Sequence, residues 1–407
     1  MPFNSFEYFI FFIIVFLFNW ALFKTNKLRI GFLLIASWYF YASNNGWLLA
    51  LLLASTAIDF VVGIVIEDSP NKRKLALFIS LLSNLGILGF FKYGNFFIDN
   101  FASASNTLGL GINTSVLEIM LPVGISFYTF QSMSYSIDVY HAKLKAERSF
   151  INFAFFVSFF PQLVAGPIVR ARYFIHQIPH KPRLTLHGFE ATLFLIASGL
   201  IKKIVLADTL GDYANVAFSN PTEAHAIIAW LGLFAFTFQI YFDFSGYTDI
   251  AIGCARFLGS RLPPNFRRPY VAVSFSEFWR RWHISLSFCL RDYLYKPLGG
   301  NKNGKIATYK NLILVMLLGG LWHGAAWTFV VWGGLHGLFL SIERLTGQGF
   351  HKKDLIGKPI ERTTRTFIIF FFCALAWLPF RADNFESLLE LIEALVRFDG
   401  PIQLHSA

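Results

Sequence analysis

The sequence has few charged residues and few cysteines for a chain of 407 residues. Charged residues make up 14% of it, whereas a soluble domain carries about 25%. Together with a mean hydropathy of +0.52, this excludes an ordinary soluble domain and indicates an integral membrane protein. The net charge of +11 lies mainly in short links between apolar segments, as in membrane proteins. We therefore expect no nucleic-acid partner, which would require a basic face on a soluble domain.

The three cysteines are far apart and flanked by apolar residues. They show no CxxC or Cys/His spacing, so we predict neither a metal site nor a disulfide framework. The sequence also lacks the GxSxG, GxxxxGK[ST] and HExxH patterns of serine hydrolases, phosphate-binding loops and zinc proteases. Asp243 and Asp249 are six residues apart, which places them on roughly opposite sides of a helix. A catalytic carboxylate pair is therefore not expected.

Apolar segments dominate what is present. The first, at residues 8–23, is followed by basic residues and not by a cleavage site, so we expect a retained span. The successive links at 24–29, 43–46, 67–74, 92–118 and 141–148 contain three, zero, three, one and three Lys or Arg residues. This alternation predicts an extracytoplasmic N-terminus, with the basic links in the cytoplasm.

Beyond residue 150 the pattern becomes irregular. Apolar stretches at 153–172 and 236–270 contain Pro, Gly and polar residues, which is typical of re-entrant segments. Spans return at 312–321, 328–342 and 367–378, with a basic, cytoplasmic link predicted at 343–365. We predict an all-α, polytopic membrane protein with roughly nine to eleven spans, and we find no internal repeat of the kind seen in many transporters.

Two histidines carry the strongest indication of chemistry. Residues 276–291, predicted to be one helix, place Ser276, Arg280, His283, Ser287 and Arg291 on one face. The alternative is an interfacial helix with its arginines among lipid headgroups. His323 lies in apolar sequence, where an ionisable residue is costly and tends to be functional. It would suit a general base, unless a neighbouring helix carbonyl simply satisfies its ring. His336 is more simply explained as a structural residue.

Known sequences provide a resemblance. The segments FWRRWHISLS (278–287), RDYLYKPLGGN (291–301) and NLILVMLLGGLWHGAAW (311–327) resemble the membrane-bound O-acyltransferase (MBOAT) family. They are most similar to the bacterial branch that includes the membrane subunit of alginate O-acetylation, and the similarity extends to Asn384. The teichoic acid D-alanyl transferases are more distant relatives that share both histidine segments.

The resemblance implies a single domain, 1–407, built as a ring of helices around a central tunnel. Residues 1–150 would supply N-terminal spans, 151–345 the catalytic core, and 346–407 a last span and an amphipathic tail. The expected location is the bacterial inner membrane. His323 matches the catalytic histidine of the family and His283 its supporting histidine.

We expect an acyl group, acetyl above all, to pass from a cytoplasmic thioester to an extracytoplasmic hydroxyl. The donor would be acetyl-CoA or an acyl carrier protein, with no tightly bound cofactor. The acceptor would be a polysaccharide or a periplasmic acetyltransferase partner. His283 would orient or polarise the thioester. The expected substrate-binding residues are Trp279, Arg280, Arg281, Ser287, Arg291, Asp292, Asn311, Trp322, Gln239 and Asp243.

Residue patterns alone leave two other functions open. One is a transporter with a His/Asp/Arg proton relay. The other is a non-catalytic membrane scaffold that recruits a soluble acetyltransferase.

Overall fold

A computed structural model describes residues 1–22, 24–43, 45–110, 120–164, 166–347 and 358–399. Within these residues every regular element is a helix, which confirms the all-α prediction. The contacts divide the chain into two compact units, residues 1–198 with 247–263 and residues 199–246 with 264–407. The single-domain organisation stays a prediction.

The first unit begins with long helices and continues into short ones. Its elements are α1 (Phe6–Ala21), α2 (Asn26–Ala42), α3 (Gly46–Asp68), α4 (Arg73–Thr107), α5 (Ile125–Tyr140), α6 (Phe150–Ser158), α7 (Phe160–Leu163), α8 (Ala171–Phe174) and the 3-10 turn η1 (Ile175–Gln177). Helix α9 (Leu186–Leu200) leads out of this unit, and the last residues of α11 (Ala226–Phe257) belong to it.

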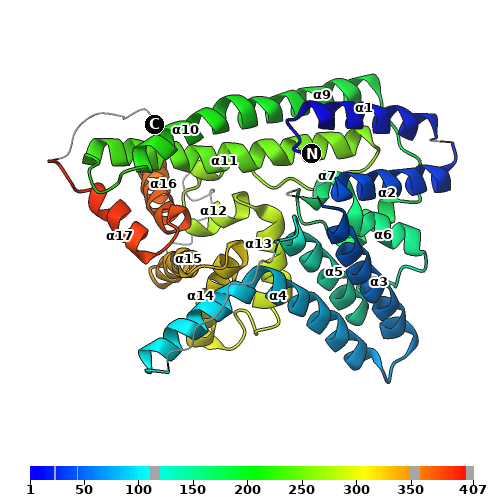
Figure 1. Cartoon of the computed structure of the whole chain (residues 1–407), viewed down its shortest axis with the longest axis horizontal. Coiled ribbons are helices and arrows are strands. Elements are labelled where there is room, and N and C mark those ends of the chain that lie inside the picture. Colours follow the sequence, from blue (N-terminus) through cyan, green and yellow to red (C-terminus); the bar gives the residue numbers. More distant parts are fainter. Residues whose placement is uncertain (23, 44, 111–119, 165, 348–357, 400–407) are drawn as a thin grey trace. The chain divides into compact units, whose positions relative to one another are not determined.

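A buried carboxylate ties three helices of the first unit together. Helices α3, α4 and α5 lie side by side (Figure 1). Asp59 of α3 accepts hydrogen bonds from Ser80 Oγ at 2.5 Å and Asn84 Nδ2 at 2.7 Å, both on α4. Ser136 of α5 donates a third at 3.2 Å. The cost of burying this polar group is offset because each of its oxygens has a hydrogen-bond donor.

The second unit contains both histidine segments. Its elements are the π-helix η2 (Ile201–Ala207), α10 (Asp208–Phe218), the first part of α11, the 3-10 turn η3 (Pro269–Val271), α12 (Phe275–Arg281), α13 (Ile284–Leu290), the π-helix η4 (Arg291–Tyr295), α14 (Gly304–His323), α15 (Trp327–Leu345), α16 (Pro359–Arg381) and α17 (Phe385–Ala394). Helix α17 is the expected amphipathic tail, and Asn384 caps it through the backbone N–H of Ser387 at 2.9 Å.

Five described helices are long and apolar enough to cross a membrane: α3, α4, α11, α14 and α16. Helix α1 is apolar but shorter, at 16 residues. The chain is therefore a multi-pass membrane protein, as predicted. The nine to eleven spans expected from the sequence exceed these five, because every apolar run is counted as a span. Several of those runs form shorter helices, such as α6 and α7.

Two predicted irregular segments are helical. Helix α4 continues to Thr107, well into the link expected at 92–118, and residues 111–118 of that link lie outside the described residues. Residues 236–257, predicted to be broken, belong to the continuous helix α11. Asp243 is accommodated there because Lys203 of η2 pairs with it at 2.5 Å, so the helix need not open to satisfy the carboxylate.

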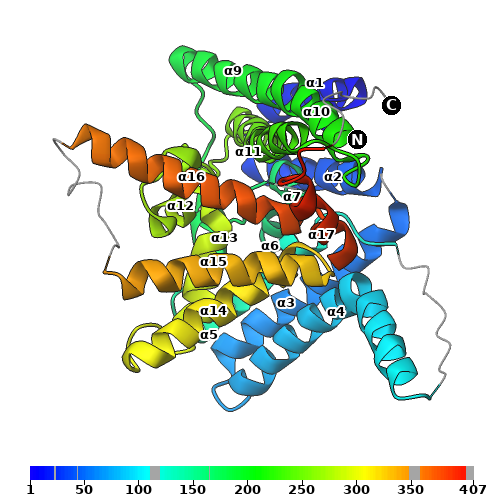
Figure 2. The same cartoon turned by 90° about the vertical axis from the view of Figure 1, so that its left-hand side faces the viewer.

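Glycines let α14 and α15 pack backbone to backbone (Figure 2). A Cβ at Gly320 would collide with the carbonyl oxygen of Phe329, and one at Gly333 with that of Met316. Small residues allow such close helix approach in membranes. At Gly320, three residues before His323, the structure therefore shows close helix packing.

We predict that Gly333→Ala destabilises this hairpin, because its methyl group would overlap the Met316 carbonyl. Overpacking of this kind costs about 1–3 kcal/mol. Gly334→Ala is the matched control, since its Cβ would lie 3.4 Å from Leu317 in ordinary contact. Thermal unfolding in detergent should show a lower midpoint for Gly333→Ala alone. Equal midpoints for the two variants would contradict the packing argument.

Candidate active site

The chain breaks sharply between the two short helices that carry the first histidine. Helix α12 ends at Arg281 and α13 begins at Ile284, with Trp282 extended at φ −97° and ψ 130°. His283 has φ 40° and ψ 55°, in the left-handed region. The prediction of one continuous helix over 276–291 is therefore wrong, and the expected stripe of polar residues is not a single face.

Asn265 explains why the helix breaks here. Its Oδ1 accepts hydrogen bonds from the Ser285 backbone N–H at 3.1 Å and the Ser285 hydroxyl at 2.8 Å, and it lies 3.2 Å from His283 Nδ1. Its backbone carbonyl accepts from the Ile284 N–H at 2.9 Å. These contacts give the backbone N–H groups of Ile284 and Ser285 the hydrogen-bond acceptors that a regular helix would otherwise provide. They offset the cost of about 1–3 kcal/mol for a left-handed residue other than glycine.

The two histidines face each other within the second unit. Their ring centroids lie 6.3 Å apart, with an interplanar angle of 65°. His283 is 1% exposed, whereas His323, the last residue of α14, is half-buried. The structure therefore brings together the two residues that the sequence singled out from segments 40 positions apart.

Aromatic rings enclose this pair. Trp322, Trp332 and Phe380 lie 5.0, 5.0 and 5.4 Å from the His323 ring, centroid to centroid. Phe244 of α11 lies 4.7 Å from the His283 ring. An apolar enclosure disfavours charged imidazoles. His283 lies outside the five candidate spans. Burial holds the pKa of its imidazole well below the ordinary value, and electrostatic repulsion from His323 lowers it further by a smaller amount.

His323 has one feature that His283 lacks. It ends α14, where unpaired backbone carbonyls carry a partial negative charge. A cation at such a position is stabilised by typically about 0.3–1 kcal/mol. His323 is therefore the better placed of the two to hold a proton transiently.

Comparisons with known proteins identify the family. Residues 143–376 match the model of the membrane-bound O-acyltransferase family. The chain is 43% identical over 372 residues to a probable alginate O-acetylase AlgI of Pseudomonas syringae, covering 90% of this chain and 70% of that protein. The chain belongs to the membrane-bound O-acyltransferase family. It is an acyltransferase.

Two further relatives show the range of the family. The peptidoglycan O-acetyltransferase of Helicobacter pylori is 38% identical over 440 residues, covering 97% of this chain and 82% of that protein. The teichoic acid D-alanyltransferase of Streptococcus thermophilus is 31% identical over 238 residues, covering 54% and 56%. The predicted closeness to the alginate type is consistent with these values.

Of the predicted substrate-binding residues of this acyltransferase, Trp322 and Trp279 lie in or beside the aromatic enclosure. Trp322 packs against both histidines, at 5.9 Å from His283 and 5.0 Å from His323. Trp279 contacts Trp332 at 5.8 Å. Both predictions of substrate contact stay untested by the geometry.

The other predicted residues are placed elsewhere or engaged by protein groups. Arg280 is exposed, and Gln239 packs over Gly211. Arg281 pairs with Glu277 at 2.5 Å, and Asp292 pairs with Arg291 at 2.9 Å and Lys296 at 2.7 Å. Asn311 donates to the carbonyls of Leu298 and Gly300, both at 3.1 Å, and Ser287 to that of Trp282 at 3.3 Å. Asp243 pairs with Lys203, as described above. Substrate contact by these residues stays a prediction.

His336 lies on α15, about one helical turn after Trp332. It is fully buried, stacks on Phe278 at 5.8 Å, and meets Trp332 at 5.0 Å. Among the described residues neither of its ring nitrogens has a hydrogen-bond partner. This environment fits the structural role favoured by the sequence. In the part of the chain that the structure describes, no group of three or more His, Cys, Asp or Glu residues could hold a metal ion.

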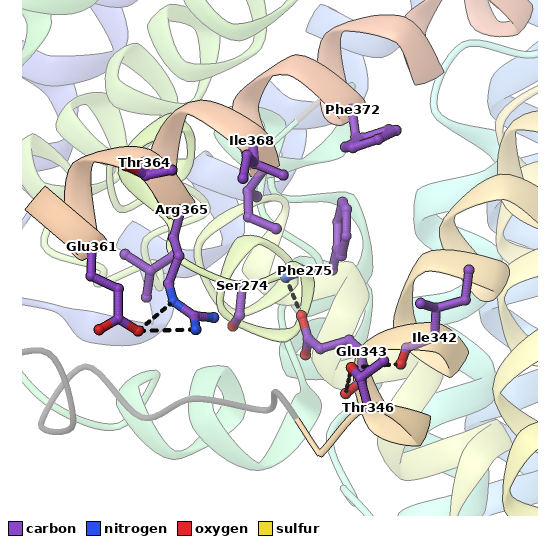
Figure 3. Close-up of a pocket in the computed structure, with 12 residues that line it drawn as sticks. Ser274, Phe275, Ile342, Glu343, Thr346, Glu361, Thr364, Arg365, Ile368 and Phe372 are labelled. Atoms are coloured by element: carbon purple, nitrogen blue, oxygen red, sulfur yellow. Dashed lines mark hydrogen bonds and ion pairs between the residues drawn. The ribbon is translucent and has the colours of Figure 1, made fainter.

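A cavity of about 450 Å³ opens beyond His336, between α12, α15 and α16 (Figure 3). Half of its lining residues are apolar and half are polar or charged, and neither His283 nor His323 contributes. Glu343 lies at its edge and is buried. Its carboxylate accepts hydrogen bonds from the backbone N–H groups of Phe275 and Ser276 and from the Ser276 hydroxyl. Glu343 therefore caps α12 from α15.

Sequence reasoning missed the residues that build this site. Asn265 follows two prolines in a polar segment, which indicates only a turn. Trp332 and Phe380 are aromatic residues in apolar sequence and cannot be distinguished there from lipid-facing ones. Glu343 is predicted to begin a cytoplasmic link, but α15 continues through it to Leu345. Residues 348–357 of that link lie outside the described residues.

We predict that Glu343→Ala destabilises the protein more than Glu343→Gln. Alanine leaves the N–H groups at the start of α12 without an acceptor, which costs about 1–3 kcal/mol. Glutamine keeps one oxygen, which can accept from both backbone N–H groups, while its NH2 group can donate to the Ser276 hydroxyl. It loses the charge, worth about 0.3–1 kcal/mol at a helix N-terminus. Thermal unfolding in detergent gives the order, and a Gln variant as unstable as the Ala variant would argue against capping.

Proposed function

We propose that this acyltransferase moves an acetyl group from a cytoplasmic thioester to a hydroxyl at the outer face of the membrane, with His323 as the general base. The observation that carries the proposal is the pair of imidazoles, 6.3 Å apart inside one aromatic enclosure, with His323 at the end of α14. The donor is acetyl-CoA or an acetylated carrier protein. The acceptor is a polysaccharide hydroxyl or a periplasmic acetyltransferase that passes the group on.

The chemical step needs no bound cofactor. The acceptor hydroxyl attacks the thioester carbonyl, and His323 takes the hydroxyl proton as the new C–O bond forms. The C–S bond then breaks, and the thiolate that leaves recovers the proton from the His323 imidazolium. The products are an O-acetyl ester and a free thiol, so every atom and proton is accounted for.

Two physical features support this role for His323. Apolar surroundings disfavour a charged imidazole, which suits a group that must act as a base. The carbonyl end of α14 favours the imidazolium during reaction. Histidine also has the unperturbed pKa nearest to neutral pH among side chains, where a general base is most effective.

The relatives support an outer-face hydroxyl as acceptor. Those similar over 90% or more of this chain are named alginate O-acetylase and peptidoglycan O-acetyltransferase. Alginate and peptidoglycan are both polysaccharides, so the proposed acceptor class is a polysaccharide. Arg280 is exposed on α12 and is available to a phosphate of the donor.

We expect His323→Ala to lower acetyl transfer by about 10²–10⁴-fold, the usual contribution of a general base. The measurement uses the purified protein in liposomes with labelled acetyl-CoA, or an acetylated carrier protein, and a polysaccharide acceptor. His187→Ala is the control, because His187 is an exposed histidine on α9. It should transfer acetyl at the unmodified rate.

The same experiment separates the alternatives. A scaffold would transfer acetyl equally well with His323 or Ala at this position, once its soluble partner is added. Equal rates for the two forms would overturn the base assignment. Stable labelling of the protein by acetyl, chased onto the acceptor, would replace direct transfer with a covalent intermediate.

A further inference from the structure

We infer that Asn265 is a positioning residue that fixes His283 as the tautomer with its proton on Nδ1, so that His283 presents Nε2 to the reaction as a hydrogen-bond acceptor. This inference rests on the proposed function, because it assigns His283 its part in the transfer. Nothing in the sequence distinguishes Asn265 from an ordinary turn residue.

The first step fixes the orientation of the Asn265 carboxamide. The group that faces Ser285 lies 3.1 Å from its backbone nitrogen. A backbone N–H is always a donor, so the facing atom must be an acceptor, the oxygen Oδ1. The amide nitrogen Nδ2 therefore points elsewhere, and it has no hydrogen-bond partner among the described residues.

The second step fixes the proton on His283. Its Nδ1 lies 3.2 Å from the same oxygen, which can only accept. In a neutral imidazole one nitrogen is a donor and the other an acceptor. Nδ1 must therefore donate to Asn265, and Nε2 carries the lone pair.

The third step concerns the charge of His283. Its neighbours are Phe244 of α11, Trp322 of α14 and His323 of α14, of which only His323 titrates. Burial keeps the imidazole neutral, as its lowered pKa indicates. A neutral ring with the proton on Nδ1 has no second N–H to give.

The consequence narrows what His283 can do. It cannot polarise the thioester carbonyl by donating a hydrogen bond to it, so of the two tasks expected for His283, orienting or polarising the thioester, this geometry favours orienting. It can only accept one, from a water, a substrate N–H or O–H, or an imidazole N–H. The ring centres are 6.3 Å apart, which exceeds direct hydrogen-bond reach between ring nitrogens.

Asn265→Asp tests this assignment with little change in shape. The carboxylate keeps the acceptor oxygen and the turn, but its charge favours the imidazolium form of His283. A neighbouring carboxylate raises a histidine pKa by about 1–3 units, and Nε2 then becomes a donor. Because burial holds the His283 pKa well below its ordinary value, this rise populates the imidazolium at acidic pH and not at pH 7. We expect acetyl transfer to fall at acidic pH and to recover as the pH rises and His283 becomes neutral again. The acid limb of the pH profile should therefore move to higher pH.

Asn215→Asp is the matched control. Asn215 is exposed on α10 and accepts a hydrogen bond from Arg381 at 3.2 Å, so the same charge is added outside the site. This variant should keep the unmodified pH profile. If Asn265 only stabilised the turn, Asn265→Asp would leave the acid limb where it is, and this result would overturn the inference.

A direct readout is the nitrogen-15 NMR spectrum of histidine-labelled protein in nanodiscs. The His283 signals are identified by their loss in His283→Gln. We expect a protonated Nδ1 and an unprotonated Nε2 at pH 7; the reverse pattern would contradict the inference. Failure of the proposed function is distinguishable, because it would appear as full activity in His323→Ala, whatever the Asn265 variants do.

Discussion

The oxygen of one asparagine side chain sets the geometry on which the active site depends. Asn265 Oδ1 meets the Ser285 N–H, the Ser285 hydroxyl and the His283 ring at once. With these contacts the chain can pass through the left-handed conformation at His283 and start a new helix. A regular helix through this segment would place His283 on the stripe with Arg280 and Arg291. The break instead separates the buried histidine from the exposed arginine side chains.

His323 is positioned by a second, independent contact. Gly320 and Gly333 let the backbones of α14 and α15 touch, and the residue next to Gly333 is Trp332. This close approach brings the Trp332 ring to 5.0 Å from His323. Trp332 in turn meets Trp377 of α16 at 5.7 Å. Small residues at the helix contact thus determine how tightly the large ones can enclose the base.

The sequence alone is most informative where the physical cost of a residue follows from its neighbours along the chain. An ionisable residue in apolar sequence is expensive, which is why His323 could be predicted as functional. Glycines in a span indicate close packing, as found at Gly320. Asn265 and Glu343 could not be predicted in the same way. Polar residues near turns and helix ends are common, and only the fold shows that these two are buried against helix starts.

The helix break at 282–283 could not be predicted either, for a related reason. Helical periodicity predicts which residues share a face if the helix continues. It cannot predict that the side chain of Asn265, distant in sequence, forms hydrogen bonds with this segment. The stripe from Ser276 to Arg291 satisfies helical spacing throughout. A distant acceptor competes with the local backbone for the N–H groups of Ile284 and Ser285. Tertiary contacts of this kind override local preference.

The two histidines differ because of where their helices begin and end. His323 closes the 20-residue helix α14, whose carbonyl end favours a positive charge. His283 precedes α13, where backbone N–H groups disfavour one, and it is the more deeply buried of the two. An incoming proton is therefore more stable on His323 than on His283. The proposed division of tasks, with His323 accepting the proton and His283 staying neutral beside it, follows from this difference between two identical side chains in one aromatic enclosure.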